Sequence, residues 1–191
     1  MKKGKTYTLD LRRKREGKTH YKKRLKLLMS DKHRLVVRRS IGNIQANIVA
    51  YDAKGDKIVL SAHSAELKKF GWKLNKGNLP SAYLVGVLLG KKAKSLGIKS
   101  AVLDLGLNKS VKGSRFYAVV AGALDADLEV PHNPGILPNK DRIAGEHIAK
   151  YAAKLKDDEA ALKKQFGSYL KNNIDPKKIV EYFNEIKSKV K

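Results

Sequence analysis

The chain has 191 residues, 42% of them apolar, which suffices for one domain with a well-buried core and argues against disorder throughout. It has no cysteine, which excludes disulfides and thiolate metal sites. Lys and Arg outnumber Asp and Glu by 42 to 18, and a net charge of +24 indicates a polyanionic partner.

The positive charge is concentrated near the N-terminus, where the first 40 residues hold 16 Lys or Arg and three acids. Two groups of cations stand out there: Arg12, Arg13, Lys14 and Arg15, then Lys18, Lys22, Lys23 and Arg24. Neutralised phosphates release condensed counterions, which drives nucleic-acid binding. Anionic lipid would need an apolar face beside the charges, and almost none precedes Leu25. We therefore expect residues 1–30 to form a basic RNA-binding extension and helix.

Helical spacing begins after this cluster. Tyr21, Leu25, Leu28 and Met29 form one apolar stripe, which predicts a helix capped by Thr19. Three strand-like stretches follow at about 34–39, 44–51 and 57–62. Their connecting turns are short, which predicts an antiparallel meander.

The middle of the chain alternates helix and strand. Pro80 lies in the first turn of a predicted helix that runs to Leu96 and ends at Gly97. An apolar strand is expected at 101–107, followed by a helix that contains 116–124. This order predicts an α/β domain over residues 31–130 with a small mixed sheet and packed helices. The connection from the meander to strand 101–107 should be a right-handed crossover.

Beyond residue 130 the pattern changes again. Pro131, Pro134 and Pro138 mark a loop, and helical stretches follow at about 141–155 and 158–171. Asp175 and the proline after it open a last helix, which runs to about residue 189. We interpret residues 131–191 as a loop and a helical C-terminal appendage. The longest apolar runs are too short to span a bilayer, and we expect no signal peptide.

The segment from Gly86 to Gly90, followed by Lys91 and Lys92, superficially resembles a phosphate-binding loop. Its glycine spacing is one residue short and no Ser or Thr follows the lysine, so we expect these glycines to allow close helix–sheet packing instead. The five histidines lack metal-ligand spacing, so no metal site is expected.

Asp104, followed by Leu105 and Gly106, ends a predicted strand, as a catalytic carboxylate does in nucleases with a ribonuclease-H-like fold. Two-metal chemistry needs further convergent acids. The nearby candidates, Asp52, Asp125 and Asp127, show no paired spacing. We expect the Asp104 carboxylate to cap the following loop, and no cofactor. A metal-dependent RNA-processing nuclease that uses Asp104 is the alternative.

Residues 13–21 read Arg-Lys-Arg-Glu-Gly-Lys-Thr-His-Tyr, which resembles the N-terminal signature of the universal large-subunit ribosomal protein family numbered eighteen, in its archaeal and eukaryotic form. Further similar segments follow in the family's order at 34–38, 62–72, 78–83, 102–108, 122–125, 130–133 and 145–151. His20 stands where the family pattern has an acidic residue, and the long C-terminal part favours the archaeal type.

The resemblance implies a small α/β domain with a ribonuclease-H-like motif and no enzymatic activity. It also implies a cytoplasmic, structural role in the large ribosomal subunit. The expected partners are 5S rRNA, 23S rRNA, a second 5S-binding protein and other large-subunit proteins, with no membrane. The protein would help to attach 5S rRNA to 23S rRNA in the central protuberance.

Candidate RNA-contacting residues fall into three groups. The N-terminal group supplies phosphate contacts and one stacking tyrosine: Arg12, Arg13, Lys14, Arg15, Lys18, Tyr21, Lys22 and Arg24. The first two strands supply a basic, polar surface: Arg34, Arg38, Arg39, Asn43, Gln45 and Asn47. A Gly/Ser loop supplies possible backbone clamps: Lys109, Lys112 and Arg115. Strand alternation places Gln45 on the face opposite Ile44 and Ile48.

Overall fold

The computed structural model describes residues 7–155 and 158–190, so Lys2, Lys3 and Lys5 of the expected basic extension lie outside the described residues. The α-helices and the strands follow in the order α1 (Arg12–Arg15), α2 (Tyr21–Leu28), β1 (His33–Arg39), β2 (Ile44–Ala50), β3 (Lys57–His63), α3 (Leu79–Ser95), β4 (Ala101–Asp104), α4 (Arg115–Leu124), α5 (Lys140–Ala144), α6 (Glu146–Lys154), α7 (Glu159–Lys171) and α8 (Ile179–Val190). This arrangement confirms the predicted α/β class.

The four strands form one mixed sheet in the order β3-β2-β1-β4. β1, β2 and β3 make the predicted antiparallel meander, and β4 pairs with β1 in parallel. Because β3 and β4 occupy opposite edges, the connection through α3 crosses the whole sheet. β4 ends three residues before the predicted end of the strand, since Gly106 turns the chain with a φ of 59°.

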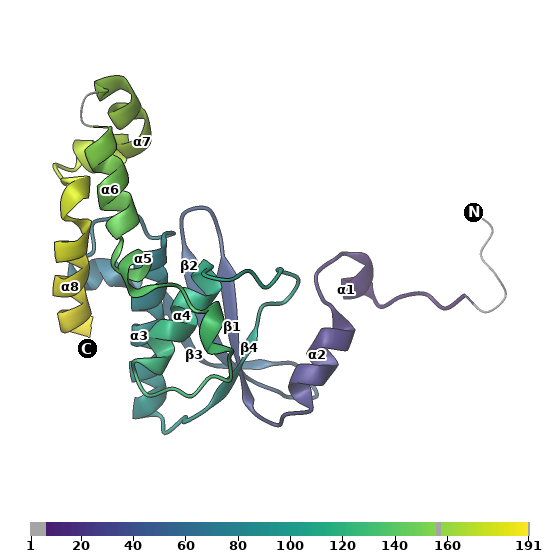
Figure 1. Ribbon diagram of the computed structural model, residues 1–191. Helices are drawn as coiled ribbons and strands as arrows, with labels where there is room; N and C mark the ends of the chain where they lie inside the picture. Colours follow the sequence, from purple (N-terminus) through teal and green to yellow (C-terminus); the bar gives the residue numbers. More distant parts are fainter. Residues whose placement is uncertain (1–6, 156–157, 191) are drawn as a thin grey trace.

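One face of the sheet packs against α3 and α4 (Figure 1). Alternate residues of β1 and β2 form that face, with Leu35, Val37 and Ile48 essentially fully buried. A covered face explains why apolar residues recur at every second position in these strands.

The glycines of α3 serve a different purpose from the one predicted. A Cβ atom at Gly86 would lie 2.1 Å from the carbonyl oxygen of Val119 in α4, and one at Gly122 would lie 2.1 Å from that of Tyr83 in α3. The expectation of helix–sheet packing was wrong, because these glycines let two helix backbones approach each other.

The C-terminal helices continue the same hydrophobic core. Phe183 of α8 packs against Tyr83 of α3 with ring centroids 5.5 Å apart. The predicted helix 141–155 is divided into α5 and α6 at Gly145, where φ is 94°. The division of the chain into extension, α/β domain and appendage stays a prediction.

α1 and α2 lie on the side of the sheet away from α3 and α4 (Figure 1). Neither helix has a buried residue, and α1 was not predicted. The cap of α2 is His20, whose Nδ1 accepts a hydrogen bond from the main-chain N–H of Lys23, so the predicted Thr19 cap was wrong. Among the described residues, no helix has both the length and the apolar content that crossing a bilayer requires.

Candidate nucleic-acid interface

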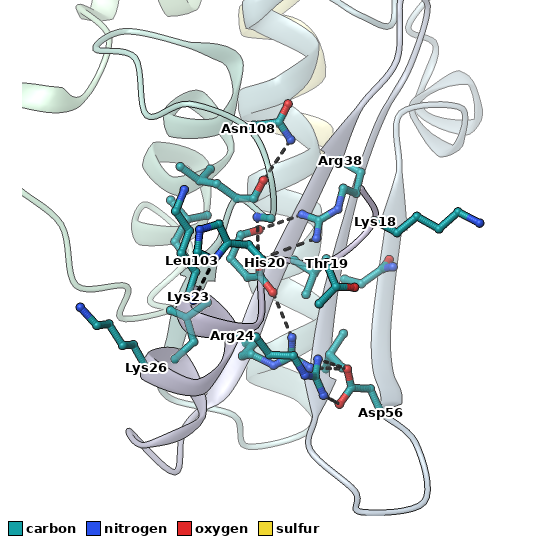
Figure 2. A pocket seen from close by; sticks show the side chains of 18 of the residues that line it. Lys18, Thr19, His20, Lys23, Arg24, Lys26, Arg38, Asp56, Leu103 and Asn108 are labelled. Atoms are coloured by element: carbon teal, nitrogen blue, oxygen red, sulfur yellow. Dashed lines mark hydrogen bonds and ion pairs between the residues drawn. The ribbon is translucent and has the colours of Figure 1, made fainter. Parts of the chain in front are cut away.

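The face of the sheet opposite α3 and α4 is only partly covered. The register of β1 places Arg34, Val36 and Arg38 on this open face, beside Asn47 of β2 and Asp104 of β4. α2 lies over part of it and leaves a groove of about 640 Å³ between helix and sheet. Figure 2 shows this groove from close by.

A carboxylate in the turn between β2 and β3 links α2 to the sheet. Both guanidinium Nη atoms of Arg24 donate to the carboxylate of Asp56, at 2.7 and 2.8 Å. Arg34, which is buried, donates to the same carboxylate at 2.5 Å. The hydrogen bonds from Arg24, reinforced by Arg34 against the opposing effect of partial burial, lower the pKa of Asp56 to about 2. Asp56 therefore stays ionised at neutral pH.

Asp104 is the second carboxylate of this network. Its Oδ1 accepts from the main-chain N–H of Gly106 at 2.7 Å, which confirms the predicted loop cap. Its Oδ2 accepts from Arg34 at 2.9 Å, and Oδ1 lies 3.7 Å from Nη2 of Arg38. Since arginines surround this carboxylate, a metal cation placed there would meet their positive charge.

The other acids considered as metal ligands are engaged elsewhere. Asp52 pairs with Lys57 at 2.6 Å, and Asp127 pairs with Lys94 at 2.8 Å. Asp125 accepts a hydrogen bond from the hydroxyl of Tyr83. Within residues 7–155 and 158–190, no three His, Asp or Glu side chains are grouped so as to hold a metal ion.

The N-terminal candidates are exposed and lie next to the groove. Arg13 and Lys18 line it, and Nε of Arg13 donates to the hydroxyl of Thr19 at 2.9 Å. Neighbouring acids pair with the other cations, in the pairs Lys14–Asp10 at 2.6 Å, Lys18–Glu16 at 2.8 Å and Arg12–Glu16 at 3.5 Å. Arg15 and Lys22 are exposed, and Tyr21 is half-buried at the first turn of α2. Exposed ion pairs are weak, so phosphates can replace these acids.

The candidates on the strands divide into two sets. Arg34, Arg38 and Asn47 line the groove, and Gln45 is exposed on the same face, opposite Ile44 and Ile48 as predicted. Asn43 lies at the start of β2, where its Oδ1 accepts from Ser64. Arg39 lies outside the groove, with its guanidinium carbon 5.6 Å from the ring centroid of Phe116.

The candidates after β4 are similarly divided. Lys109 and Lys112 are exposed in the loop between β4 and α4. Arg115 donates to the carbonyl oxygen of Gly77 at 2.6 Å, and burial, with a smaller effect from Arg39, lowers its pKa. Arg115 and Arg34 thus have structural roles inside the protein, and their contact with RNA stays a prediction.

Sequence reasoning did not select several residues of the groove. His20, Lys23 and Leu27 line it beside Arg24, which was a candidate, and the four follow the spacing i, i+3, i+4, i+7, so the helical period could have grouped them. Asn108 and Ser110 also line the groove. The parallel pairing of β4 with β1 brings the loop after β4 to the groove, and no local sequence pattern predicts that pairing.

The family model described as "Ribosomal large subunit proteins 60S L5, and 50S L18" matches residues 5–99, about half of the chain. The chain belongs to this family. This L18-type protein is therefore a structural, rRNA-binding component of the large subunit of the cytoplasmic ribosome, with rRNA and other large-subunit proteins as partners. The matched segment contains α1, α2 and the first three strands, which build most of the groove.

Proposed function

We propose that this L18-type protein binds 5S rRNA and helps to attach it to 23S rRNA in the central protuberance. The supporting observation is the gathering of exposed cations from α1 and α2 beside the open face of the sheet. Residues 12–26 contain nine Lys or Arg and a single acid, Glu16. None of the residues of α1 or α2 is buried, so these helices are available to a partner.

The proposal assigns different tasks to different parts of the chain. The N-terminal extension holds phosphates, the α/β domain carries the open face that meets the RNA, and the C-terminal helices extend the core away from it. The presence of α7 and α8 favours the archaeal type. The protein needs no catalytic group for this role, and the Asp104 carboxylate serves to hold Arg34 and the loop at Gly106.

A triple substitution tests the proposal: Arg13→Ala, Arg15→Ala and Lys18→Ala. Each lost phosphate contact should lower the slope of log affinity against log salt by about one, so the slope should fall by about three. Affinity for 5S rRNA at low salt should fall on the order of tenfold or more. Filter binding over a salt series measures both quantities.

The matched control removes three exposed lysines from the C-terminal helical region: Lys164→Ala, Lys171→Ala and Lys178→Ala. The overall change in charge is identical, so a general electrostatic effect would weaken both variants alike. We expect the control to bind 5S rRNA like the parent. Equal losses in the two variants, or parental binding by the N-terminal variant, would contradict the proposal.

A further inference from the structure

The interior of the groove differs in charge from its rim. Three arginines of the interior, Arg24, Arg34 and Arg38, are bound to the carboxylates of Asp56 and Asp104. These guanidinium groups are therefore engaged within the protein, and the two carboxylates offset most of their positive charge, so the interior attracts a phosphate less than the lysines of the rim do. A neutral group that forms hydrogen bonds does not depend on that charge.

The rim carries the cations that remain available to phosphates. Lys23 and Lys26 line the groove from α2, and Lys18 does so from the preceding turn. In Figure 2 the side chains of Lys18 and Lys26 extend away from the centre on opposite sides, whereas Arg24 is held against Asp56. The phosphates of a nucleic-acid backbone can thus lie along the rim while an uncharged part of the nucleic acid enters the groove.

The guanidinium group of Arg38 provides a planar surface inside the groove. Nη1 of Arg38 donates to the carbonyl oxygens of Val37 and Asp104, at 2.8 and 3.0 Å, and this fixes the guanidinium plane. The side chain is nevertheless 46% exposed. Gly106 packs so closely that a Cβ atom there would lie 2.8 Å from Nη2 of Arg38. Fixed guanidinium planes stack well on nucleobases.

The walls of the groove offer apolar surface and a hydrogen-bonding side chain to a nucleobase. Val36, Val49 and Ile58 give the sheet side apolar surface, and Leu27 faces them from α2. Asn47 offers its side-chain amide to a base edge, since the hydrogen bond that its Oδ1 accepts from Nε2 of Gln45 is long, at 3.4 Å. A cavity of about 640 Å³ has room for one nucleotide.

We propose that the groove between α2 and the open face of the sheet accepts one unpaired nucleobase of the bound RNA, stacked on Arg38, with the adjoining phosphates on the lysine rim. This inference rests on the proposed function and deepens it. It predicts that the protein recognises an unpaired or extruded nucleotide and not only the backbone of a duplex.

The absence of cysteine from the chain permits a direct test, because one introduced thiol is unique. Ile58→Cys places the thiol in the groove at a position that is 62% exposed on an edge strand, where the fold tolerates a change. Val59→Cys is the control, since this neighbouring residue is exposed but does not line the groove. The rate of alkylation is measured without ligand, with a short oligoadenylate and with inorganic polyphosphate of equal charge.

Oligoadenylate should slow alkylation of the Ile58→Cys variant by about fivefold or more at saturation, whereas polyphosphate should not. Neither ligand should protect the Val59→Cys variant. Equal protection by polyphosphate would show that the groove takes phosphate, and the inference would be wrong.

The same alkylation with 5S rRNA separates this inference from the proposed function. If 5S rRNA binds but leaves the Ile58→Cys thiol as reactive as before, only the nucleobase site fails. If 5S rRNA does not bind, the proposed function fails first.

Arg38→Lys gives a second measure, because it keeps the positive charge and removes the planar guanidinium group. Affinity for oligoadenylate should then fall on the order of tenfold with an unchanged salt slope, and an unchanged affinity would contradict stacking on Arg38.

Discussion

Replacing Asp56 by Asn removes the charge that holds α2 to the sheet. Arg24 would lose a bidentate partner, and buried Arg34 would keep Asp104 as its carboxylate partner. Folding lowers the pKa of Asp56 from 3.8 to about 2, but Asp56 is exposed, so solvent screens much of the corresponding stabilisation. We therefore expect Asp56→Asn to lower the free energy of unfolding by about 1 kcal/mol at pH 7.

Urea denaturation followed by fluorescence measures this change, because the single tryptophan, Trp72, is 2% exposed and reports on the core. The pH dependence has a defined sign. Since folding lowers the pKa of Asp56, its contribution is complete above pH 4 and is lost as pH falls toward about 2. The stability difference between parent and variant should shrink over this interval.

Asp127→Asn serves as the control for the loss of one carboxylate. Its ion pair with Lys94 is exposed, and asparagine tolerates the positive φ of 66° at this position. We expect little change in its unfolding curve. If Asp56→Asn is equally neutral at pH 7, or if its difference from the parent persists unchanged near pH 2, the network of Asp56 does not stabilise the fold as we describe.

Three further predictions concern other parts of the molecule. Asp104→Asn should lower the free energy of unfolding by about 3 kcal/mol, because it leaves buried Arg34 without one of its two carboxylate partners. The purified parent protein should not cleave RNA in the presence of Mg²⁺; cleavage by the parent that Asp104→Asn abolishes would favour the nuclease alternative. Gly86→Ala should destabilise by about 3 kcal/mol in thermal unfolding, since the new Cβ meets the backbone of α4 with no side chain that could move aside. Affinity for 5S rRNA should fall on the order of 10³-fold between about 50 and 200 mM salt, and a flat response in filter binding would exclude a phosphate-dominated interface.

The sequence predicts the local elements well, because their signals are local. Apolar alternation marks β1 and β2, and Pro80 marks the start of α3. The assignments fail where distant segments meet. Arg34 counts as one more cation in a basic sequence, yet it lies buried between Asp56 and Asp104, which are 22 and 70 residues away. No local sequence pattern predicts which strands pair and so which carboxylates lie beside Arg34.

The same limit applies to the groove. The basic N-terminal cluster is evident from charge alone, whereas its position over the open face depends on the contact between Arg24 and Asp56. The role of the α3 glycines also needed the fold, because the sequence shows that a backbone approaches closely but not which one. Charge composition thus indicated the class of partner, and tertiary pairing decides which cations are free to bind it.

The central claim is that this protein recognises 5S rRNA specifically. The most direct measurement is competition at about 150 mM salt, with labelled 5S rRNA bound to the full chain and displaced by unlabelled RNAs. We predict that unlabelled 5S rRNA displaces the label at a concentration at least tenfold lower than a structured RNA of equal length and unrelated sequence. Displacement by both RNAs at the same concentration would contradict the claim. It would show that the basic surface binds polyanions without preference for 5S rRNA.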